Sequence, residues 1–169
     1  EYSRRFKQVI TRIAPIMENR GIDEVYIDLT EVPNGQEQGG YHVAQQLQQG
    51  ILEATQLTCS IGVAPNKLLA KMASEFNKPN GISIVYPHEL QSRIWPLPCS
   101  KINGIGPKSN AKQAQHNIDT IRDLAARDVF ELMELFGRNY GQWLHYAAWG
   151  RDDSPVTTHS EPITMSRVT

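Results

Sequence analysis

The start of the chain carries its apolar side chains at the spacing of an α-helix. This spacing predicts an amphipathic helix over residues 2–14, with four residues on its apolar face: Phe6, Val9, Ile10 and Ile13. Pro15 ends the helix, because proline lacks the backbone N–H that a further turn would need. Two short strands are predicted after it, over residues 16–22 and 25–29, and the second shows the cleaner alternation of apolar and polar positions.

Helical and strand patterns continue to alternate as far as Tyr86. Apolar residues at helical spacing predict a helix over residues 42–55, and residues 57–64 are predicted to form a buried strand. The pair Pro65-Asn66 can start and cap another helix, whose apolar face carries Leu68, Leu69 and Met72. A β-branched segment returns the chain to a short strand at residues 82–85. The pattern therefore predicts an α/β (α+β) region that ends at Tyr86.

The pattern changes at Pro87, where short helical segments begin to follow one another. They are separated by proline and glycine residues, among them Pro96, Pro98, Gly104, Gly106, Gly137 and Gly150. This arrangement predicts a second, small all-α domain over residues 87–153.

The charge of the chain is nearly balanced, with 18 acidic and 17 basic residues. Taken alone, this balance argues against a protein that binds polyanions over its whole surface. The distribution is more informative, because residues 90–118 contain no acidic residue and four basic ones: Arg93, Lys101, Lys108 and Lys112. This segment is therefore suited to face phosphate groups.

Composition places the chain among soluble globular proteins, with 40% hydrophobic residues available for a core. No apolar run approaches the length of a membrane span, and the first residues lack the order of a signal peptide. We therefore expect a cytoplasmic location. Cys59 and Cys99 lie in no metal-ligand spacing and are predicted to be reduced thiols that pack as small apolar side chains.

Two adjacent carboxylates, Asp23 and Glu24, stand at the head of the alternating strand. Side chains alternate along a strand, so the two project differently but can still converge on one cation. Oxygen ligands of this kind suit Mg²⁺, which proteins hold by one or two carboxylates together with substrate phosphates. A solvated strand end explains an isolated Asp-Glu pair more simply, so the rest of the chain must decide between the two interpretations.

Residues 101–112 match a helix-hairpin-helix motif, in which a short helix, a tight turn and a second helix follow one another. The turn consists of Gly104, Ile105 and Gly106. Its glycines allow the backbone to approach a phosphate, and the N–H groups at the start of the next helix favour an anion. Lys108 and Lys112 add positive charge. Such contacts bind a nucleic-acid backbone without reading its sequence. An ordinary glycine-closed turn is the alternative, but Pro107 at the helix start and the acid-free surroundings favour DNA.

Three further features carry weaker signals. Lys78 lies in a turn at residues 77–81 and is an ordinary solvated lysine unless it shares a site with a metal-bound nucleotide. Residues 136–138 have the form of a second hairpin turn. No neighbour of the tryptophans suggests base stacking, so we expect them to pack within the core or at a domain contact: Trp95, Trp143 and Trp149.

Five motifs stand in an order that resembles the Y-family of translesion DNA polymerases, and among them the bacterial DNA polymerase IV group. Together they run through almost the whole chain and are far more specific than any one alone. They are Ile22-Asp23-Glu24-Val25-Tyr26-Ile27-Asp28, Ser60-Ile61-Gly62-Val63-Ala64, Lys67-Leu68-Leu69-Ala70-Lys71, Asn77-Lys78-Pro79-Asn80-Gly81 and Ile102-Asn103-Gly104-Ile105-Gly106.

The resemblance implies a division of the chain. Residues 1–86 would be part of a polymerase palm, residues 87–153 the thumb with its helix-hairpin-helix motif, and residues 154–169 a linker leading into the first strand of the little finger.

The resemblance also implies roles for single residues. Asp23 and Glu24 match the paired palm carboxylates that hold the catalytic Mg²⁺ ions, two in the complete site. Lys78 matches a lysine that contacts the incoming deoxynucleoside triphosphate. The thumb contact with primer-template DNA falls on Gly104, Ile105, Gly106, Lys108 and Lys112. A sliding clamp would bind through regions outside this sequence, and no membrane is implied.

The implied activity is template-directed nucleotide addition past damaged bases, a DNA-repair function. The family palm needs a third carboxylate, in an Asp-x-Asp-x-aromatic-aromatic motif that does not occur here, and the fingers are also missing. We therefore expect the isolated chain not to polymerise. A non-catalytic Y-family relative that acts as a DNA-binding or interaction module is the alternative, against which the retained acids count. A palm-fold nucleotidyl cyclase is disfavoured by the thumb-like hairpin.

Overall fold

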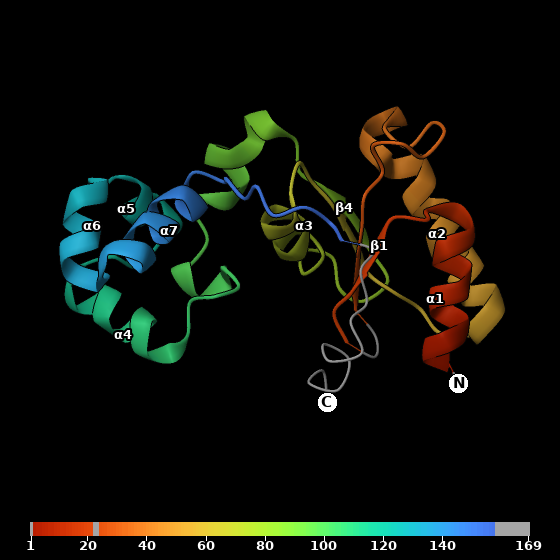
Figure 1. The fold of residues 1–169 in the computed structure, drawn as a ribbon, viewed down its shortest axis with the longest axis horizontal. Helices are drawn as coiled ribbons and strands as arrows, with labels where there is room; N and C mark the ends of the chain where they lie inside the picture. The colour runs from red at the N-terminus through yellow and green to blue at the C-terminus, as the bar shows by residue number, and fades with distance from the viewer. Residues whose placement is uncertain (1, 22–23, 158–169) are drawn as a thin grey trace. The chain divides into compact units, whose positions relative to one another are not determined.

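The computed structural model describes residues 2–21 and 24–157, which fall into two compact units (Figure 1). The first unit comprises Glu1–Val63, Ala73–Ile84 and Ser154–Thr169. The second comprises Ala64–Met72 and Val85–Asp153. Each unit is therefore assembled from stretches that are separated in the sequence.

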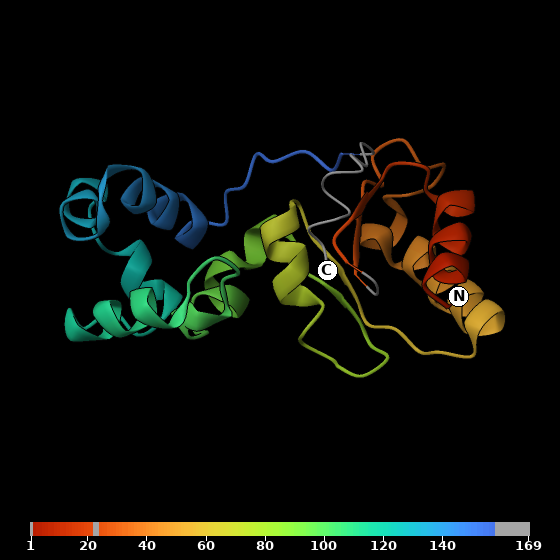
Figure 2. The ribbon, with the colours of Figure 1, turned by 60° about the horizontal axis from the view of Figure 1, so that its bottom comes forward.

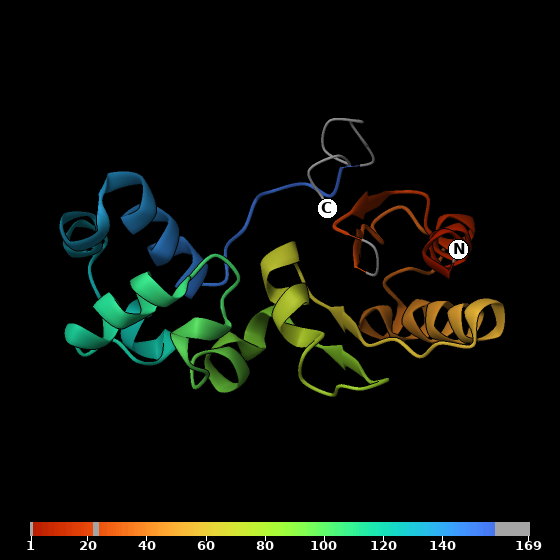
Figure 3. The same cartoon turned by 90° about the horizontal axis from the view of Figure 1, so that it is seen from below.

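Helices α1 (Tyr2–Ile13) and α2 (Tyr41–Thr55) lie side by side in the first unit (Figures 1 and 3). Both helices were expected from the spacing of their apolar residues, and both predictions are confirmed. Their facing sides form the centre of a buried apolar cluster that contains Val9, Ile10, Val43, Leu47 and Ile51.

Strands β1 (Met17–Asn19) and β2 (Val25–Ile27) pair antiparallel, with Glu18 opposite Tyr26. Both are shorter than the strands predicted from the sequence. The chain reverses at Gly21, whose φ of +144° is open to glycine and strained for other residues, and strand geometry ends before it.

The segment that begins at Ser154 returns to strand β1 of the first unit. Glu18 is 8% exposed, and one of its carboxylate oxygens accepts the backbone N–H of Thr157 at 3.1 Å. The other oxygen lies 3.6 Å from the guanidinium of Arg20. This carboxylate therefore fastens residue 157 to a strand that lies 139 positions earlier in the chain.

Strands β3 (Ile61–Val63) and β4 (Ile82–Ile84) pair in parallel, with Ile61 opposite Ile82. The prediction of a strand over residues 57–64 was too long. Residues 57–60 have no strand pairing, because strand geometry requires a partner and β4 is only three residues long.

Helix α3 (Lys67–Ala73) connects β3 to β4, and all but its last residue belongs to the second unit. The predicted cap is present, since the Oδ1 of Asn66 accepts the N–H of Leu69 at 2.9 Å. The amide of Asn66 also donates to the carbonyl of Gly150 at 2.7 Å, and Asp152 accepts the N–H of Leu68 at 3.2 Å. The apolar face is buried as expected, at Leu68, Leu69 and Met72.

The rest of the second unit is helical (Figure 2). Three short helical turns come first: η2 (Pro87–Glu89), η3 (Leu90–Ile94) and η4 (Cys99–Lys101). Four α-helices follow: α4 (Pro107–Gln115), α5 (Ile121–Ala125), α6 (Val129–Phe136) and α7 (Arg138–Ala148). The predicted fold class, an α/β region followed by a small all-α region, is confirmed.

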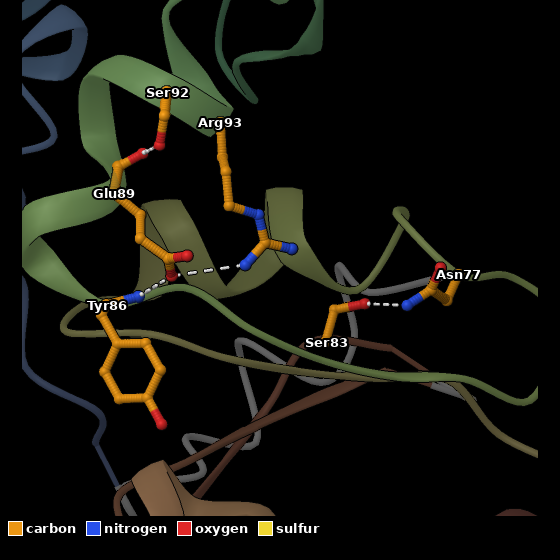
Figure 4. A network of polar contacts seen from close by, with 6 residues as sticks. All are labelled: Asn77, Ser83, Tyr86, Glu89, Ser92 and Arg93. Atoms are coloured by element: carbon orange, nitrogen blue, oxygen red, sulfur yellow. Dashed lines mark hydrogen bonds and ion pairs between the residues drawn. The ribbon is translucent and has the colours of Figure 1, made fainter.

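A polar network stabilises the entry into this unit (Figure 4). The carboxylate of Glu89 accepts the N–H of Tyr86 at 2.9 Å and lies 3.4 Å from the guanidinium of Arg93. The hydroxyl of Ser92 donates to the carbonyl of Glu89 at 3.3 Å. These bonds close the first helical turn after β4.

The core of the second unit is built largely of branched aliphatic residues that are almost fully buried: Ile94, Ile102, Ile118, Ile121, Leu124, Leu132 and Leu144. Among the helices formed by residues 2–21 and 24–157, none combines the length and the apolar character needed to cross a bilayer.

Candidate functional site

The predicted acid pair lies only partly within the described residues. Asp23 lies outside them. Glu24 is half-buried directly before β2, and its carbonyl accepts the N–H of Arg20 at 3.0 Å across the reversal. The convergence of Asp23 and Glu24 on a cation therefore stays a prediction.

The donor set on this strand suits Mg²⁺ in type but supplies few ligands. Asp28 follows on the same strand, yet its Oδ1 accepts the N–H of Thr30 at 2.9 Å. Hydrogen bonds from the side chain and backbone of Thr30 hold the pKa of Asp28 below its ordinary value. Within residues 2–21 and 24–157, three or more histidine, cysteine or acidic side chains nowhere gather as a metal site would require. Glu24 is thus the described oxygen ligand that fits the predicted role.

Lys78 lies in the predicted turn between α3 and β4. Two hydrogen bonds hold this turn, from the amide of Asn77 to the hydroxyl of Ser83 at 2.9 Å and from the N–H of Asn80 to the hydroxyl of Ser60 at 3.0 Å (Figure 4 shows the first). The Lys78 ammonium lies 3.0 Å from the carboxylate of Glu75, and both side chains are about half exposed, at 51% and 45%. An exposed pair of this kind contributes at most about 1 kcal/mol, so an anionic ligand can replace Glu75 at little cost.

The predicted helix-hairpin-helix is present at η4 and α4. Gly104 adopts a φ of +110°, Ile105 turns inward and is 8% exposed, and Gly106 precedes α4 at the N-cap position. Pro107 occupies the first turn of α4 as expected, and Lys108 beside it is exposed. The hairpin therefore offers two glycines and a lysine at the start of a helix.

Helix α4 begins differently from its neighbours α5 and α6. Helix α5 starts with a capping box in which Thr120 and Asp123 bond each other's backbone, and Asp128 caps α6 by accepting the N–H of Phe130 at 3.1 Å. No side chain caps α4 among the described residues. Its first N–H groups are left without such an acceptor, which is the electrostatic setting that favours an anion.

Lys112 is engaged within the protein. Its ammonium donates to the carbonyl of Leu135 and lies 5.3 Å from the ring centroid of Phe136. A phosphate contact at Lys112 would have to share or replace these contacts. The ammonium of Lys108, by contrast, forms no hydrogen bond or ion pair with another of the residues that the structure describes.

The residues that were expected as a second hairpin turn join α6 to α7. Gly137 has a φ of +93°, and α7 starts directly after it without a side-chain cap. Two of the tryptophans pack inside the second unit as expected: Trp95 donates its indole N–H to the carbonyl of Ala148 at 2.9 Å, and Trp143 lies against Gly104.

Known proteins share both parts of this arrangement. The profile of the impB/mucB/samB family matches residues 1–75, and that of the IMS family HHH motif matches residues 87–118. DNA polymerase IV 1 of Methanosarcina mazei is 44% identical over 151 residues, which make up 89% of this chain and 41% of that protein. The crystal structure of DinB from Sulfolobus solfataricus is 32% identical and aligns with a TM-score of 0.81 over 92% of this chain and 46% of that one. The chain belongs to the DinB-like Y-family polymerases.

A second solved Y-family structure, the insertion ternary complex of Dbh DNA polymerase, aligns with a TM-score of 0.82 at 32% identity over 92% of this chain and 45% of that one. The chain thus spans less than half the length of these Y-family relatives, at 41 to 46%. Membership in the family agrees with the resemblance seen in the ordered motifs.

Two residues near the Y-family motifs were missed by the sequence interpretation. The ammonium of Lys7 donates to the carbonyl of Gly21 at 2.7 Å, so α1 supports the turn that leads into the acid pair. A lysine beside the apolar face of the first helix was a usable signal for such a contact. The hydroxyl of Tyr140 donates to the carbonyl of Gly104 at 3.0 Å. The local sequence gives no signal for this contact, because the two residues lie 36 positions apart.

Proposed function

We propose that this chain is the palm and thumb portion of a translesion DNA polymerase. The assignment of residues 1–86 to the palm, 87–153 to the thumb and 154–169 to the approach to the little finger is part of this proposal. The observation that carries it is the hairpin at Gly104 and Gly106, which opens onto an uncapped helix with Lys108 exposed beside it.

DNA binding follows from the chemistry of this hairpin. Exposed backbone N–H groups at the start of α4 and the ammonium of Lys108 both favour a phosphate oxygen. Phosphates are the same at every base, so the hairpin would hold primer-template DNA without selecting a sequence. Lys112 belongs to the same proposed surface and would reach a phosphate only by sharing its contact with Leu135.

The catalytic part of the proposal rests on the acid pair and Lys78. Asp23 and Glu24 would hold Mg²⁺, which in two-metal phosphoryl transfer activates the primer hydroxyl and neutralises charge on the triphosphate. Lys78 would bind the triphosphate of an incoming deoxynucleotide in place of Glu75. The Dbh relative forms an insertion ternary complex, and this supports the same class of substrates here.

Replacement of either acid tests the catalytic assignment. In the complete protein from which the chain derives, Asp23→Ala and Glu24→Ala should each abolish primer extension while DNA binding is retained. Asp28→Ala is the matched control, because its carboxylate is occupied by Thr30, and it should retain extension. Extension by the Asp23→Ala or Glu24→Ala protein at the parent rate would show that the acids are misassigned.

The isolated 169-residue chain is expected to bind primed DNA without extending it. The family palm uses three carboxylates, and two of them are found in this sequence. Extension of a labelled primer by the chain alone, at any rate above a no-enzyme control, would contradict this expectation.

A non-catalytic DNA-binding module is the second candidate. The observation in its favour is the hairpin at Gly104 and Gly106 with its uncapped helix, which lies wholly within the described residues and needs no metal. The coding sequence upstream of residue 1 decides between the two. An Asp-x-Asp-x-aromatic-aromatic motif there supports the polymerase, and an open reading frame without it supports the module.

A further inference from the structure

The hairpin turn of the second unit rests on aromatic side chains of helix α7. Tyr140 and Trp143 lie one turn apart on α7, with their ring centroids 5.5 Å apart and their planes 20° from parallel. The hydroxyl of Tyr140 donates to the carbonyl of Gly104 at 3.0 Å. A distant helix therefore contacts the backbone of the turn directly.

Trp143 leaves room at this point for glycine alone. A Cβ on Gly104 would lie 2.6 Å from one indole carbon and 2.9 Å from another, and the φ of +110° would itself strain any other residue. The six-membered ring of the indole thus lies directly against the turn. Gly104 is required by its backbone conformation and by this close approach together.

The peptide group between Gly104 and Ile105 is bonded on both of its sides. Its carbonyl accepts from Tyr140, and its N–H donates to the carbonyl of Ile102 at 3.1 Å. A peptide group is rigid and planar, so these two bonds set its rotation. Its rotation in turn sets the direction in which the chain enters Gly106 and the first turn of α4.

The far side of α4 is tied to the same helices. Lys112 contacts the carbonyl of Leu135 and the ring of Phe136, and Phe136 lies edge-on to Tyr140 with centroids 6.5 Å apart. Arg127 donates to the carbonyl of His116 at 2.6 Å, just after α4 ends. These contacts hold the second half of α4 and the residue that follows it. The first turn of α4 is held instead by the hairpin turn that precedes it.

We propose that Tyr140 is a positioning residue for phosphate binding: its hydroxyl holds the 104–105 peptide so that the N–H groups of α4 and the ammonium of Lys108 point to one phosphate of a nucleic-acid backbone. This inference rests on the proposed DNA contact of the hairpin. The ring of Tyr140 would stack on Trp143 equally well without its hydroxyl, so the hydroxyl serves the turn and not the packing.

The test compares Tyr140→Phe with Tyr146→Phe in the full chain. Both substitutions remove one hydroxyl from α7 and keep the ring, and Tyr146 is exposed and contacts His145, away from the hairpin. Affinity is measured with a fluorescein-labelled primer-template duplex at several salt concentrations. Tyr140→Phe should weaken binding about two- to tenfold, the range expected for one lost hydrogen bond, and Tyr146→Phe should leave it unchanged.

Two further readouts separate positioning from general stability. Amide hydrogen exchange at Ile105, measured without DNA, should be faster in Tyr140→Phe and unchanged in Tyr146→Phe, while exchange at Leu132 and Leu144 stays as in the parent. In a double-mutant cycle, Lys108→Ala with Tyr140→Phe should lose less affinity than the sum of the two single losses, because both substitutions act on the same phosphate contact.

The outcomes are distinguishable. Weakened binding by Lys108→Ala with normal binding by Tyr140→Phe, or strictly additive losses in the double variant, would overturn the positioning role and leave the DNA contact standing. Normal binding by Lys108→Ala and by Tyr140→Phe would overturn the DNA contact of the hairpin itself. Weakened binding by both, with less than additive losses, supports the proposal.

Discussion

Asp123 shows how a single carboxylate is held at a helix start of the second unit. Its Oδ2 accepts the backbone N–H groups of Asp119 and Thr120, each at 3.1 Å. In return, the hydroxyl of Thr120 accepts the N–H of Asp123 at 3.1 Å. The backbone hydrogen bonds lower the pKa of Asp123 below its ordinary value, because they stabilise the ionised form.

Loss of this charge should make stability depend less on pH. Asp123→Asn should lower the free energy of unfolding by roughly 1 kcal/mol at pH 7, the usual size of a capping interaction. The folded-state pKa lies below the unfolded value of about 3.9, so the stabilisation is complete above that value and disappears as the pH falls through the folded-state pKa. Urea denaturation at a series of pH values measures it.

Asp119→Asn is the control. It removes a neighbouring exposed carboxylate, but the backbone N–H of residue 119 still donates to Asp123. If the stability difference between Asp123→Asn and the parent persisted unchanged down to pH 2, the ionised carboxylate of Asp123 would not be its cause.

At Lys78, the competing partner Glu75 should weaken binding of a triphosphate. In the complete protein, Glu75→Gln should lower the KM for the incoming nucleotide by up to about fivefold, since the exposed pair is worth at most about 1 kcal/mol. Lys78→Met should raise it. Glu53→Gln, which changes an exposed carboxylate on α2, is the control for the change in net charge. A KM raised by Glu75→Gln would contradict the exchange of partners at Lys78.

The two cysteines behave as their sequence context predicted. Both are free thiols, and Cys99 is fully buried with its thiol donating to the carbonyl of Thr120 at 3.0 Å. Burial raises the pKa of Cys99 to about 12, with smaller contributions from nearby Asp123 and Asp119. Its thiol therefore stays protonated at physiological pH and is unreactive.

At the scale of elements, helices α6 and α7 pack so closely that one position between them excludes every side chain. A Cβ on Gly141 would lie 2.5 Å from both the Cα and the backbone nitrogen of Met133. Backbone atoms cannot move aside as the end of a flexible side chain can. The contact between the two helices therefore depends on glycine at this position.

Gly141→Ala should force α6 and α7 apart and lower the free energy of unfolding by about 1–3 kcal/mol, in the range of overpacked cores. Gly106→Ala is the matched control, because nothing lies within 4 Å of the position that its Cβ would take and its φ is −82°. Thermal unfolding followed by circular dichroism compares the two. Equal melting temperatures for both variants would refute the close contact.

Helices were predicted more accurately than strands, for a physical reason. The apolar face of α1 or α2 repeats within the helix itself, so its extent can be read locally. A strand ends where its partner ends, and the sequence of residues 57–64 carries no information about the three-residue length of β4. Local residues likewise indicated the hairpin at Gly104, but its support by Tyr140 depends on packing between segments that are remote in sequence.

Lys112 is another residue of the candidate site whose contacts could not be predicted from the local sequence. Its charge and its position after the hairpin pointed to a phosphate, and the contact with Leu135, 23 residues away, could not be seen in the sequence. The assignments of Asp23, Glu24, Lys78 and the hairpin residues to metal, nucleotide and DNA remain predictions that rest on family resemblance and on the exposure of the described side chains.

At the scale of the whole molecule, the two units are interleaved along the sequence. Residues Ala64–Met72 belong with the helical unit, although the first expectation placed the whole stretch to Tyr86 in the α/β region. Leu69 lies near Gly150, and Asn66 and Leu68 bond to Gly150 and Asp152. Helix α3 thus depends on residues at the end of the second unit.

A cut after residue 86 should therefore leave α3 unprotected. In a fragment of residues 1–86, amide hydrogen exchange over residues 69–72 should be much faster than in a fragment of residues 1–153, which retains Gly150 and Asp152. Both fragments keep strands β3 and β4 and differ in residues 87–153, which supply the partners of α3. Equal protection in the two fragments would show that α3 is stable without the end of the second unit.

The interleaving of the units also matters while the chain is being made. Asn66 leaves the ribosome 84 residues before Gly150, a delay of roughly 4 to 17 seconds at ordinary rates of synthesis. Thr157 reaches Glu18 later still, after 139 residues. During that interval Asn66 and Leu68 lack Gly150 and Asp152, the groups to which they bond in the folded protein, so α3 is incompletely held and open to chaperones and to other nascent chains. The final contacts of each unit can form only when synthesis of this region is nearly over.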